Sequence, residues 1–165
     1  MHTSETGPKT STSSLYETDF YAWTQEQAQL LRNHQFDSID LENLIEEVES
    51  LGRQERRELE NRLSILIAHL LKWEYQPEKR SRSWLSTIRV QRRDSSKLLR
   101  KNPSLKPDID EIIIDAYDNA KDLAMGETNL PKRTFPAECL YSVAEILDEK
   151  FYPGETGEWE SELGE

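Results

Sequence analysis

The pair of residues in this sequence whose types and spacing could do chemistry is Arg62 with His69. They lie seven positions apart in a segment with helical apolar spacing, so both side chains project from one face, about two turns apart. Histidine titrates near neutral pH and can serve as a general acid or base, and arginine can pair with an anionic group. The alternative is structural: both side chains satisfy carboxylates inside a helical bundle. We favour this structural interpretation.

The spacing of this pair resembles the Arg-x(4–6)-His motif of the HEPN superfamily, because six residues lie between Arg62 and His69. Members of that superfamily are helical-bundle domains that often dimerise and cleave RNA. The resemblance implies RNA cleavage without a metal, with Arg62 and His69 as the working pair. The sequence departs from the motif at Leu63, where such motifs usually place a polar residue. Whether the chain is an enzyme stays open, and the lack of a second catalytic motif leans against it.

Acidic residues and a histidine in one long segment raise the question of a metal site. Ligand types are present at Glu46, Glu47, Glu49 and His69, but the sequence has no Glu-x-x-His pair. It also lacks a glycine-rich phosphate loop, a CxxC pair and a GxSxG elbow. We therefore predict no metal and no cofactor, and we interpret the glutamates as a solvated helix face.

A basic segment is hidden in a chain whose formal net charge is −11. Residues 78–106 contain ten Lys and Arg against two acidic residues, a net of +8. The arginines could contact phosphates while a tryptophan stacks on a base, which would make residues 79–101 a nucleic-acid interface. The alternative is internal neutralisation by glutamates of the long helix or of the C-terminus. The residues predicted to bind are Trp73, Trp84, Arg80, Arg82 and Arg89.

The end of the long predicted helix and the turn after it are dense in distinctive residues. Trp73 and Trp84 flank Gln76 and Pro77, and His69 lies about one turn before Trp73. Aromatic side chains there could wall a pocket or anchor a protein interface, although core packing is their more common role. Of the regions of the chain, we therefore consider this corner the best candidate for a functional site.

The elements that would position these residues are helices. Apolar residues recur at helical spacing and no long segment alternates with a period of two, so the sequence predicts an all-α fold. We expect an up-and-down helical bundle of four to five helices with one long central helix. Helices are predicted at 18–33, 39–75, from 81 or 83 to 102, from after 104 to about 125, and at 138–150. Thr18 should cap the first helix, and Gly126 should end the fourth.

One folded domain is predicted over residues 15–153, between two tails. Residues 1–14 are small and polar, and residues 154–165 carry five glutamates and no Lys or Arg, so both are expected to be disordered. The lone Cys139 cannot form an internal disulfide, and the N-terminus lacks the apolar core of a signal peptide. Because no apolar run approaches bilayer length, we predict a cytoplasmic protein that contacts no membrane.

Longer motifs connect the chain to a known family. They are Tyr16 to Trp23, Leu41 to Gly52, His69 to Trp73, Gln76-Pro77, Ser83-Trp84, Asn102 to Leu105 and Phe135-Pro136. On these motifs the sequence from Leu15 to Pro153 resembles the bacterial, largely cyanobacterial family catalogued as domain of unknown function 29. The resemblance implies an all-helical domain in a cytoplasmic protein, and it implies no activity.

The leading functional interpretation is a non-enzymatic interaction or regulatory protein. A protein partner or a homodimer is expected, because the long helix carries more apolar surface than one small bundle covers.

Overall fold

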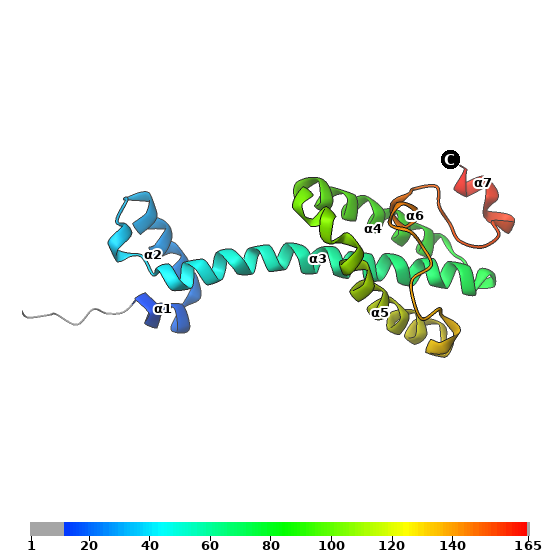
Figure 1. The fold of residues 1–165 in the computed structure, drawn as a ribbon, viewed down its shortest axis with the longest axis horizontal. Helices are drawn as coiled ribbons and strands as arrows, with labels where there is room; N and C mark the ends of the chain where they lie inside the picture. Colours follow the sequence, from blue (N-terminus) through cyan, green and yellow to red (C-terminus); the bar gives the residue numbers. More distant parts are fainter. Residues whose placement is uncertain (1–11, 165) are drawn as a thin grey trace, which may run out of the picture. The chain divides into compact units, whose positions relative to one another are not determined.

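The computed structural model describes residues 12–164, which form seven α-helices and no strand (Figure 1). This confirms the predicted all-α fold with one long central helix. The helices are α1 (Thr12–Thr18), α2 (Phe20–Arg32), α3 (Leu41–Tyr75), α4 (Arg82–Lys101), α5 (Ile109–Thr128), α6 (Val143–Leu147) and α7 (Glu160–Leu163). The 3-10 turns are η1 (Phe36–Ser38), η2 (Pro77–Lys79), η3 (Pro103–Asp108), η4 (Lys132–Thr134) and η5 (Gly157–Trp159).

Two compact units share these helices, and the boundary between them falls after Arg53. Unit 1 contains α1, α2 and the first part of α3. Unit 2 contains the rest of α3 and the helices α4 to α7. The sequence predicts one domain over residues 15–153, whereas the structure divides the chain within α3. Residues 52–58 contain no apolar residue, so the apolar spacing stops near this boundary, but it resumes at Leu59 and one helix is therefore predicted across it.

Side-chain caps explain where two of the long helices begin. The Asp19 carboxylate accepts a hydrogen bond from the Ala22 N–H at 3.0 Å, so α2 is capped by Asp19 and not by Thr18 as predicted. A charged carboxylate is favoured over a neutral hydroxyl at the positive end of the helix dipole. At the start of α4, the Ser81 hydroxyl accepts from the Trp84 N–H at 3.2 Å.

The end of α5 differs from the prediction that Gly126 is its C-cap. The helix continues to Thr128, and the cap is Asn129, whose φ of 59° lies in the left-handed region. Asparagine tolerates that conformation better than most residues, so it can end a helix as glycine does. The Asn129 N–H donates to the Met125 carbonyl at 3.1 Å, which closes the last turn.

We expect the substitution Gly126→Ala to raise the free energy of unfolding by about 1 kcal/mol, because glycine costs that much more than alanine inside a helix. A Cβ at position 126 would meet no heavy atom within 4 Å, so no clash offsets the gain. The measurement is urea unfolding followed by far-UV circular dichroism. A loss of stability would contradict a helical backbone at this position.

Unit 1 is held by polar contacts around one buried aromatic side chain. Among the described residues of this unit, Trp23 is the one large apolar side chain that is buried, and its indole N–H donates to Asp40 at 3.1 Å. The buried Gln27 accepts the Asp40 backbone N–H through Oε1 at 2.7 Å. The Tyr16 hydroxyl donates to Glu47 at 2.6 Å, and this bond raises the pKa of Tyr16 to about 12. These bonds tie α1 and α2 to the region around the start of α3.

Unit 2 has an extensive hydrophobic core. Helices α3, α4 and α5 each contribute leucine, isoleucine or alanine side chains that are withdrawn from solvent. They include Leu59, Leu63, Leu66, Ile67, Leu70, Leu85, Ile88, Ile112, Ala116 and Ala120. The side chain of Ile146 on α6 joins the same cluster. Burying a side chain of this size stabilises the fold by about 1.5–3 kcal/mol, so the stability of unit 2 rests mainly on this core.

The C-terminal segment differs from the disordered acidic tail predicted for residues 154–165. The described part, up to residue 164, folds into η5 and α7. Trp159 lies edge-on to Trp73 with ring centroids 5.4 Å apart, and Leu163 packs against the same core. These apolar side chains anchor the segment despite its acidic composition. Of the predicted N-terminal tail, residues 1–11 lie outside the described residues, and residues 12–14 belong to α1.

Candidate functional site

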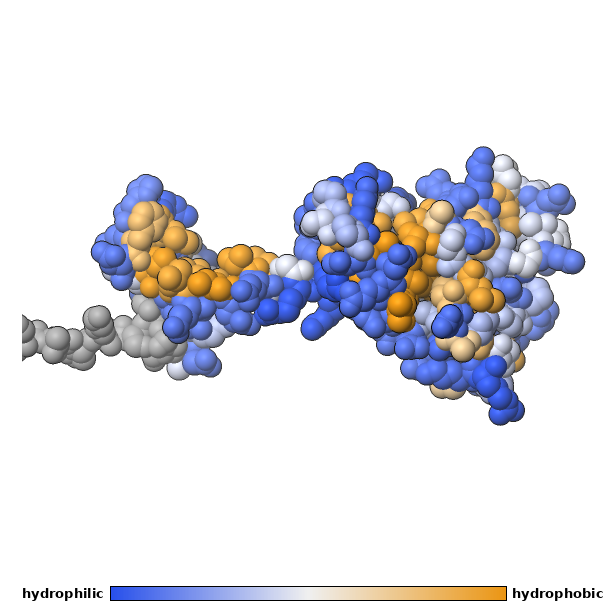
Figure 2. Space-filling view, in the orientation of Figure 1, coloured by the Kyte–Doolittle hydropathy of each residue, from blue (hydrophilic) through white to orange (hydrophobic). Residues whose placement is uncertain are grey.

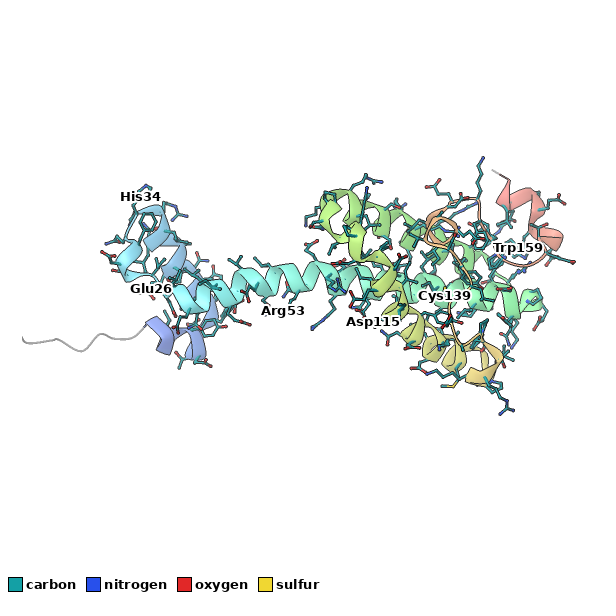
Figure 3. All side chains as sticks on the ribbon, in the orientation of Figure 1. Glu26, His34, Arg53, Asp115, Cys139 and Trp159 are labelled. Atoms are coloured by element: carbon teal, nitrogen blue, oxygen red, sulfur yellow. The ribbon has the colours of Figure 1, made fainter. Side chains whose placement is uncertain are left out.

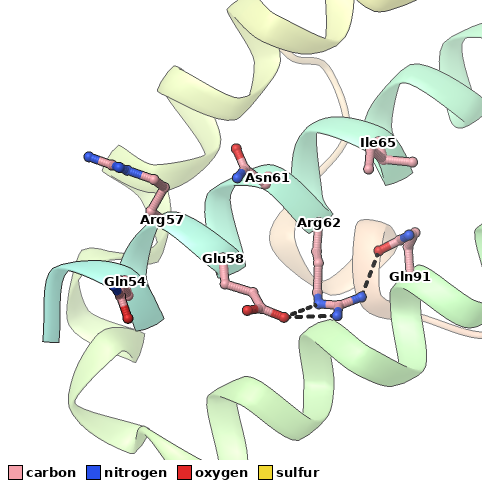
Figure 4. Close-up of a pocket in the computed structure, with 7 residues that line it drawn as sticks. All are labelled: Gln54, Arg57, Glu58, Asn61, Arg62, Ile65 and Gln91. Carbon is pink, nitrogen blue, oxygen red and sulfur yellow. Dashed lines mark hydrogen bonds and ion pairs between the residues drawn. The ribbon is translucent and has the colours of Figure 1, made fainter. Parts of the chain in front are cut away.

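Arg62 lies on the part of α3 that belongs to unit 2, and its guanidinium donates to side chains on α3 and α4, including Glu58 and Gln91 (Figure 4). It donates to Glu58 from Nε at 3.0 Å and from Nη2 at 2.8 Å. Its Nη1 donates to Asp94 at 3.2 Å and to Gln91 at 3.4 Å. The Arg62 side chain is 29% exposed to solvent. Together with Arg57 it lines a surface hollow of about 460 Å³. Two carboxylates therefore already neutralise the charge that would have to bind a phosphate.

His69 is half-buried, and its Nδ1 lies 2.9 Å from the Ile65 carbonyl oxygen. A carbonyl accepts only, so Nδ1 carries the proton and Nε2 keeps its lone pair in the neutral ring. Burial lowers the pKa of His69, and the nearby charge of Lys72 lowers it further. The ring is thus suited to accept a proton at neutral pH. Arg62 and His69 belong to separate hydrogen-bond networks.

We expect His69 to make the stability of the chain depend on pH. Its ordinary pKa is 6.5 and its folded pKa is lower, so the unfolded chain takes up the proton first as the pH falls. The contribution of neutral His69 is complete above about pH 6.5 and is lost as the pH falls through the lowered folded pKa. Urea midpoints over about pH 5–7 should therefore depend less on pH in His69→Gln than in the wild type. His34→Gln, at an exposed position, is the matched control; equal slopes in all three proteins would contradict the expectation.

Lys72 is a buried cation that no sequence pattern points to, because its neighbours in the chain are apolar and its spacing matches no motif. Only 4% of the residue is exposed. Its ammonium lies 2.5 Å from a Glu127 carboxylate oxygen and 4.5 Å from the ring centroid of Trp84. The chain's own cation therefore occupies one side of the Trp84 ring, which is half-buried. This contact leaves less of that ring for a stacked base.

Trp73 and Arg80 form part of the packing around the C-terminal segment. Trp73 is completely buried, and the Arg80 guanidinium lies 4.9 Å from its ring centroid. Arg80 also donates to the carbonyl oxygen of Trp73 at 2.8 Å and to that of Glu155 at 2.5 Å. The structure thus brings Trp73 and Arg80 together as packing partners, with Trp73 buried and Arg80 half-buried.

Arg82 and Arg89 both contact Glu162 of α7. Arg82 donates to the Glu162 carboxylate at 3.1 Å, and Arg89 donates to the Glu162 carbonyl oxygen at 3.0 Å. Near the other end of α4, Lys101 pairs with Glu55 at 2.9 Å. The ion pairs of Arg82 and Lys101 support internal neutralisation at the two ends of α4, the alternative that the sequence left open. Nucleic-acid binding through residues 79–101 stays a prediction.

A second hollow, of about 770 Å³, lies between α5 and residues 137–144. Ile113, Tyr117 and Val143 line it, together with Cys139, which lies between η4 and α6 (Figure 3). Burial raises the pKa of the Cys139 thiol, so it stays protonated and weakly nucleophilic at neutral pH. Sequence analysis missed this hollow because its lining residues come from segments that only the fold brings together.

Unit 1 carries an exposed apolar surface on α2, α3 and the turn between them (Figure 2). On α3 we call Leu41, Ile45, Val48 and Leu51 the α3 stripe; each is between 49% and 66% exposed. The exposed large apolar side chains elsewhere in the unit are Phe20, Tyr21, Leu31 and Phe36. The sequence predicts the stripe as part of one continuous apolar face, but the structure leaves it uncovered.

Within the described residues, no helix combines the length and hydropathy needed to cross a membrane. Across the same part of the chain, no three His, Cys, Asp or Glu side chains come together in a way that could hold a metal ion.

These features define an all-α protein with a packed helical unit, residues 54–165, and a smaller acidic unit that exposes an apolar helix face. The chain belongs to the family described as Domain of unknown function DUF29, whose model matches residues 15–152. The resemblance drawn from the sequence motifs is therefore confirmed. No curated protein and no solved structure matches the chain.

Proposed function

We propose that this chain is a non-enzymatic interaction protein that binds a partner protein through unit 1. The observation that carries the proposal is the imbalance of burial within that unit. Its described residues bury one large apolar side chain, Trp23, and expose eight. Clustered exposed apolar side chains are typical of protein interfaces, because burying them on binding removes apolar area from water.

The contacts in unit 2 support a structural role for the candidate catalytic pair. Arg62 is held by Glu58 and Asp94, and His69 is bonded to the backbone of its own helix. The basic residues of α4 that sequence analysis singled out contact Glu162. Nucleic-acid binding is therefore not part of this proposal. The proposal includes a cytoplasmic location, which the family resemblance implies.

The test uses a tagged full-length chain purified from the cells that produce it. We expect a protein to co-purify with the wild type and with Ile114→Asn, and to be lost from Val48→Asn/Leu51→Gln. Ile114 is an exposed apolar residue of unit 2, so Ile114→Asn is the same kind of apolar-to-polar substitution made away from the α3 stripe. Retention of the same proteins by all three chains, or of none by the wild type, would contradict the proposal.

A second candidate is metal-independent RNA cleavage by Arg62 and His69. One observation favours it: the Nδ1 hydrogen bond leaves the lone pair on Nε2 of His69, and the lowered pKa keeps that nitrogen unprotonated at neutral pH. It predicts cleavage of RNA in the presence of a metal chelator, lost in His69→Ala while the circular dichroism spectrum is unchanged. Absence of cleavage, or equal cleavage by the variant, would exclude it.

A further inference from the structure

The chemistry of the partner can be inferred from the α3 stripe, and this inference rests on the proposed function. We infer that the stripe binds a basic amphipathic helix of another protein. The stripe residues lie four, three and three positions apart, so they follow one face of α3. That spacing is the one a partner helix uses when it lays its apolar face along another helix.

The length of the stripe sets the size of the partner segment. From Leu41 to Leu51 the helix rises about 15 Å, at about 1.5 Å per residue. Leu41 and Leu51 are 58% and 62% exposed, so the surface is open at both ends. A partner helix of about three turns would cover it.

The charge of unit 1 selects the sign of the partner. Residues 12–53 contain nine Asp and Glu and two Lys and Arg, a net of −7, and residues 33–52 contain no Lys or Arg. Residues 54–164 carry a net of only −3 although they are more than twice as many. The acidic charge is thus concentrated in the unit that exposes the apolar stripe. Such a surface attracts a partner whose polar face carries Lys and Arg.

The acidic residues of α3 flank the stripe along its length. Glu42, Glu46 and Glu49 lie four and three positions apart, so they form a parallel row beside the stripe. Arg53 pairs with Glu46 at 2.8 Å and with Glu49 at 3.8 Å, and it is the one basic residue on the unit 1 part of the helix. A single arginine cannot balance three carboxylates, so the row stays negative.

The same charges disfavour the other occupants of the stripe. A second copy would bring another net −7 against the first, and like charges in apposition oppose binding. Nucleic acids and anionic membranes are repelled for the same reason. A basic helix is the occupant for which the apolar contact and the charge attraction act in the same direction.

The test compares two synthetic peptides of about four turns with identical leucines at helical spacing, one with lysine and one with glutamate on the polar face. Calorimetric titration of the full chain should show the lysine peptide binding at least about tenfold more tightly. Raising the salt from about 0.1 M to about 1 M should weaken that binding about tenfold. Binding should fall about tenfold in Val48→Asn/Leu51→Gln, several-fold in Glu42→Gln/Glu49→Gln, and not in Ile114→Asn.

Equal affinity for the two peptides, no binding of either, or binding that ignores the stripe variants would overturn the inference. So would binding to vesicles of anionic lipid that the stripe variants abolish. A dimer in light scattering that becomes a monomer in Val48→Asn/Leu51→Gln would assign the stripe to a second copy and overturn it too.

The experiments distinguish a failure of the inference from a failure of the proposed function. If neither peptide binds while the tagged chain still retains a stripe-dependent protein, the inference is wrong and the proposed function stands. If no stripe-dependent protein is retained, the proposed function fails at its own test.

Discussion

Replacing Arg92 with methionine is expected to lower the free energy of unfolding by about 3 kcal/mol. The residue is 1% exposed, and its guanidinium donates to three backbone carbonyls: Ile146 at 2.8 Å, Glu145 at 3.4 Å and Phe151 at 2.6 Å. Methionine fills similar space but donates nothing, so these buried acceptors would lose their partner. Arg92 therefore fixes the segment from α6 to Phe151 against α4.

The neighbouring substitution Arg93→Ala is the control for this prediction, because the Arg93 side chain is mostly exposed. It should change the free energy of unfolding by at most about 0.5 kcal/mol. Both variants are compared with the wild type by urea unfolding followed by far-UV circular dichroism. If Arg92→Met were no less stable than Arg93→Ala, Arg92 would not hold this segment.

Replacing Trp73 with alanine is expected to lower the free energy of unfolding by about 4 kcal/mol. Its side chain is completely buried, and its ring lies 5.4 Å from the rings of both Tyr152 and Trp159. Alanine would leave a cavity and remove the surface on which η5 rests. The prediction also separates two interpretations of Trp73, since a residue that serves a binding pocket can be truncated at much lower cost.

Trp84→Ala is the matched control, because Trp84 is a half-buried tryptophan of the same corner. Its truncation should cost less, about 1–2 kcal/mol. Thermal and urea unfolding of both variants give the comparison. A Trp73→Ala chain that is as stable as Trp84→Ala would contradict the core role of Trp73.

The long helix could be predicted from the sequence because its apolar residues recur mostly three or four positions apart, on both sides of the polar residues 52–58: the sequence predicts residues 39–75, and the structure has Leu41–Tyr75. Which parts of its apolar face are covered could not be predicted. Leu41 and Leu63 both lie on the predicted apolar face of the helix, yet Leu63 is fully buried and Leu41 is 58% exposed. Coverage depends on which other helices pack nearby, and that is a property of the tertiary fold.

The burial of two cationic side chains also could not be predicted from the sequence. Arg92 and Lys72 look like solvated residues of basic or mixed helices, and only the fold brings carbonyls to one and a carboxylate to the other. The sequence predicts a disordered tail around Trp159, because acidic residues surround it in the chain. The segment is nevertheless ordered, because the ring of Trp159 packs against Trp73.

For the candidate pair Arg62 and His69, the sequence predicts the helix on which they lie but not all of the side chains around them. Arg62 and His69 were correctly expected on one helix, but the carboxylates that hold Arg62 come from Glu58 on α3 and from Asp94 on α4. The second of these contacts depends on how α4 packs, which no local pattern specifies. Their role in catalysis stays a prediction.

The central claim, that unit 1 binds a protein through the α3 stripe, is tested most directly by photo-crosslinking inside the producing cells. A photoreactive amino acid would replace Val48 in one chain and Ile114 in another, since these residues are 66% and 65% exposed and belong to different units. The account predicts an adduct with a second protein from position 48 and none from position 114. The same adducts from both positions, or none from position 48, would contradict it.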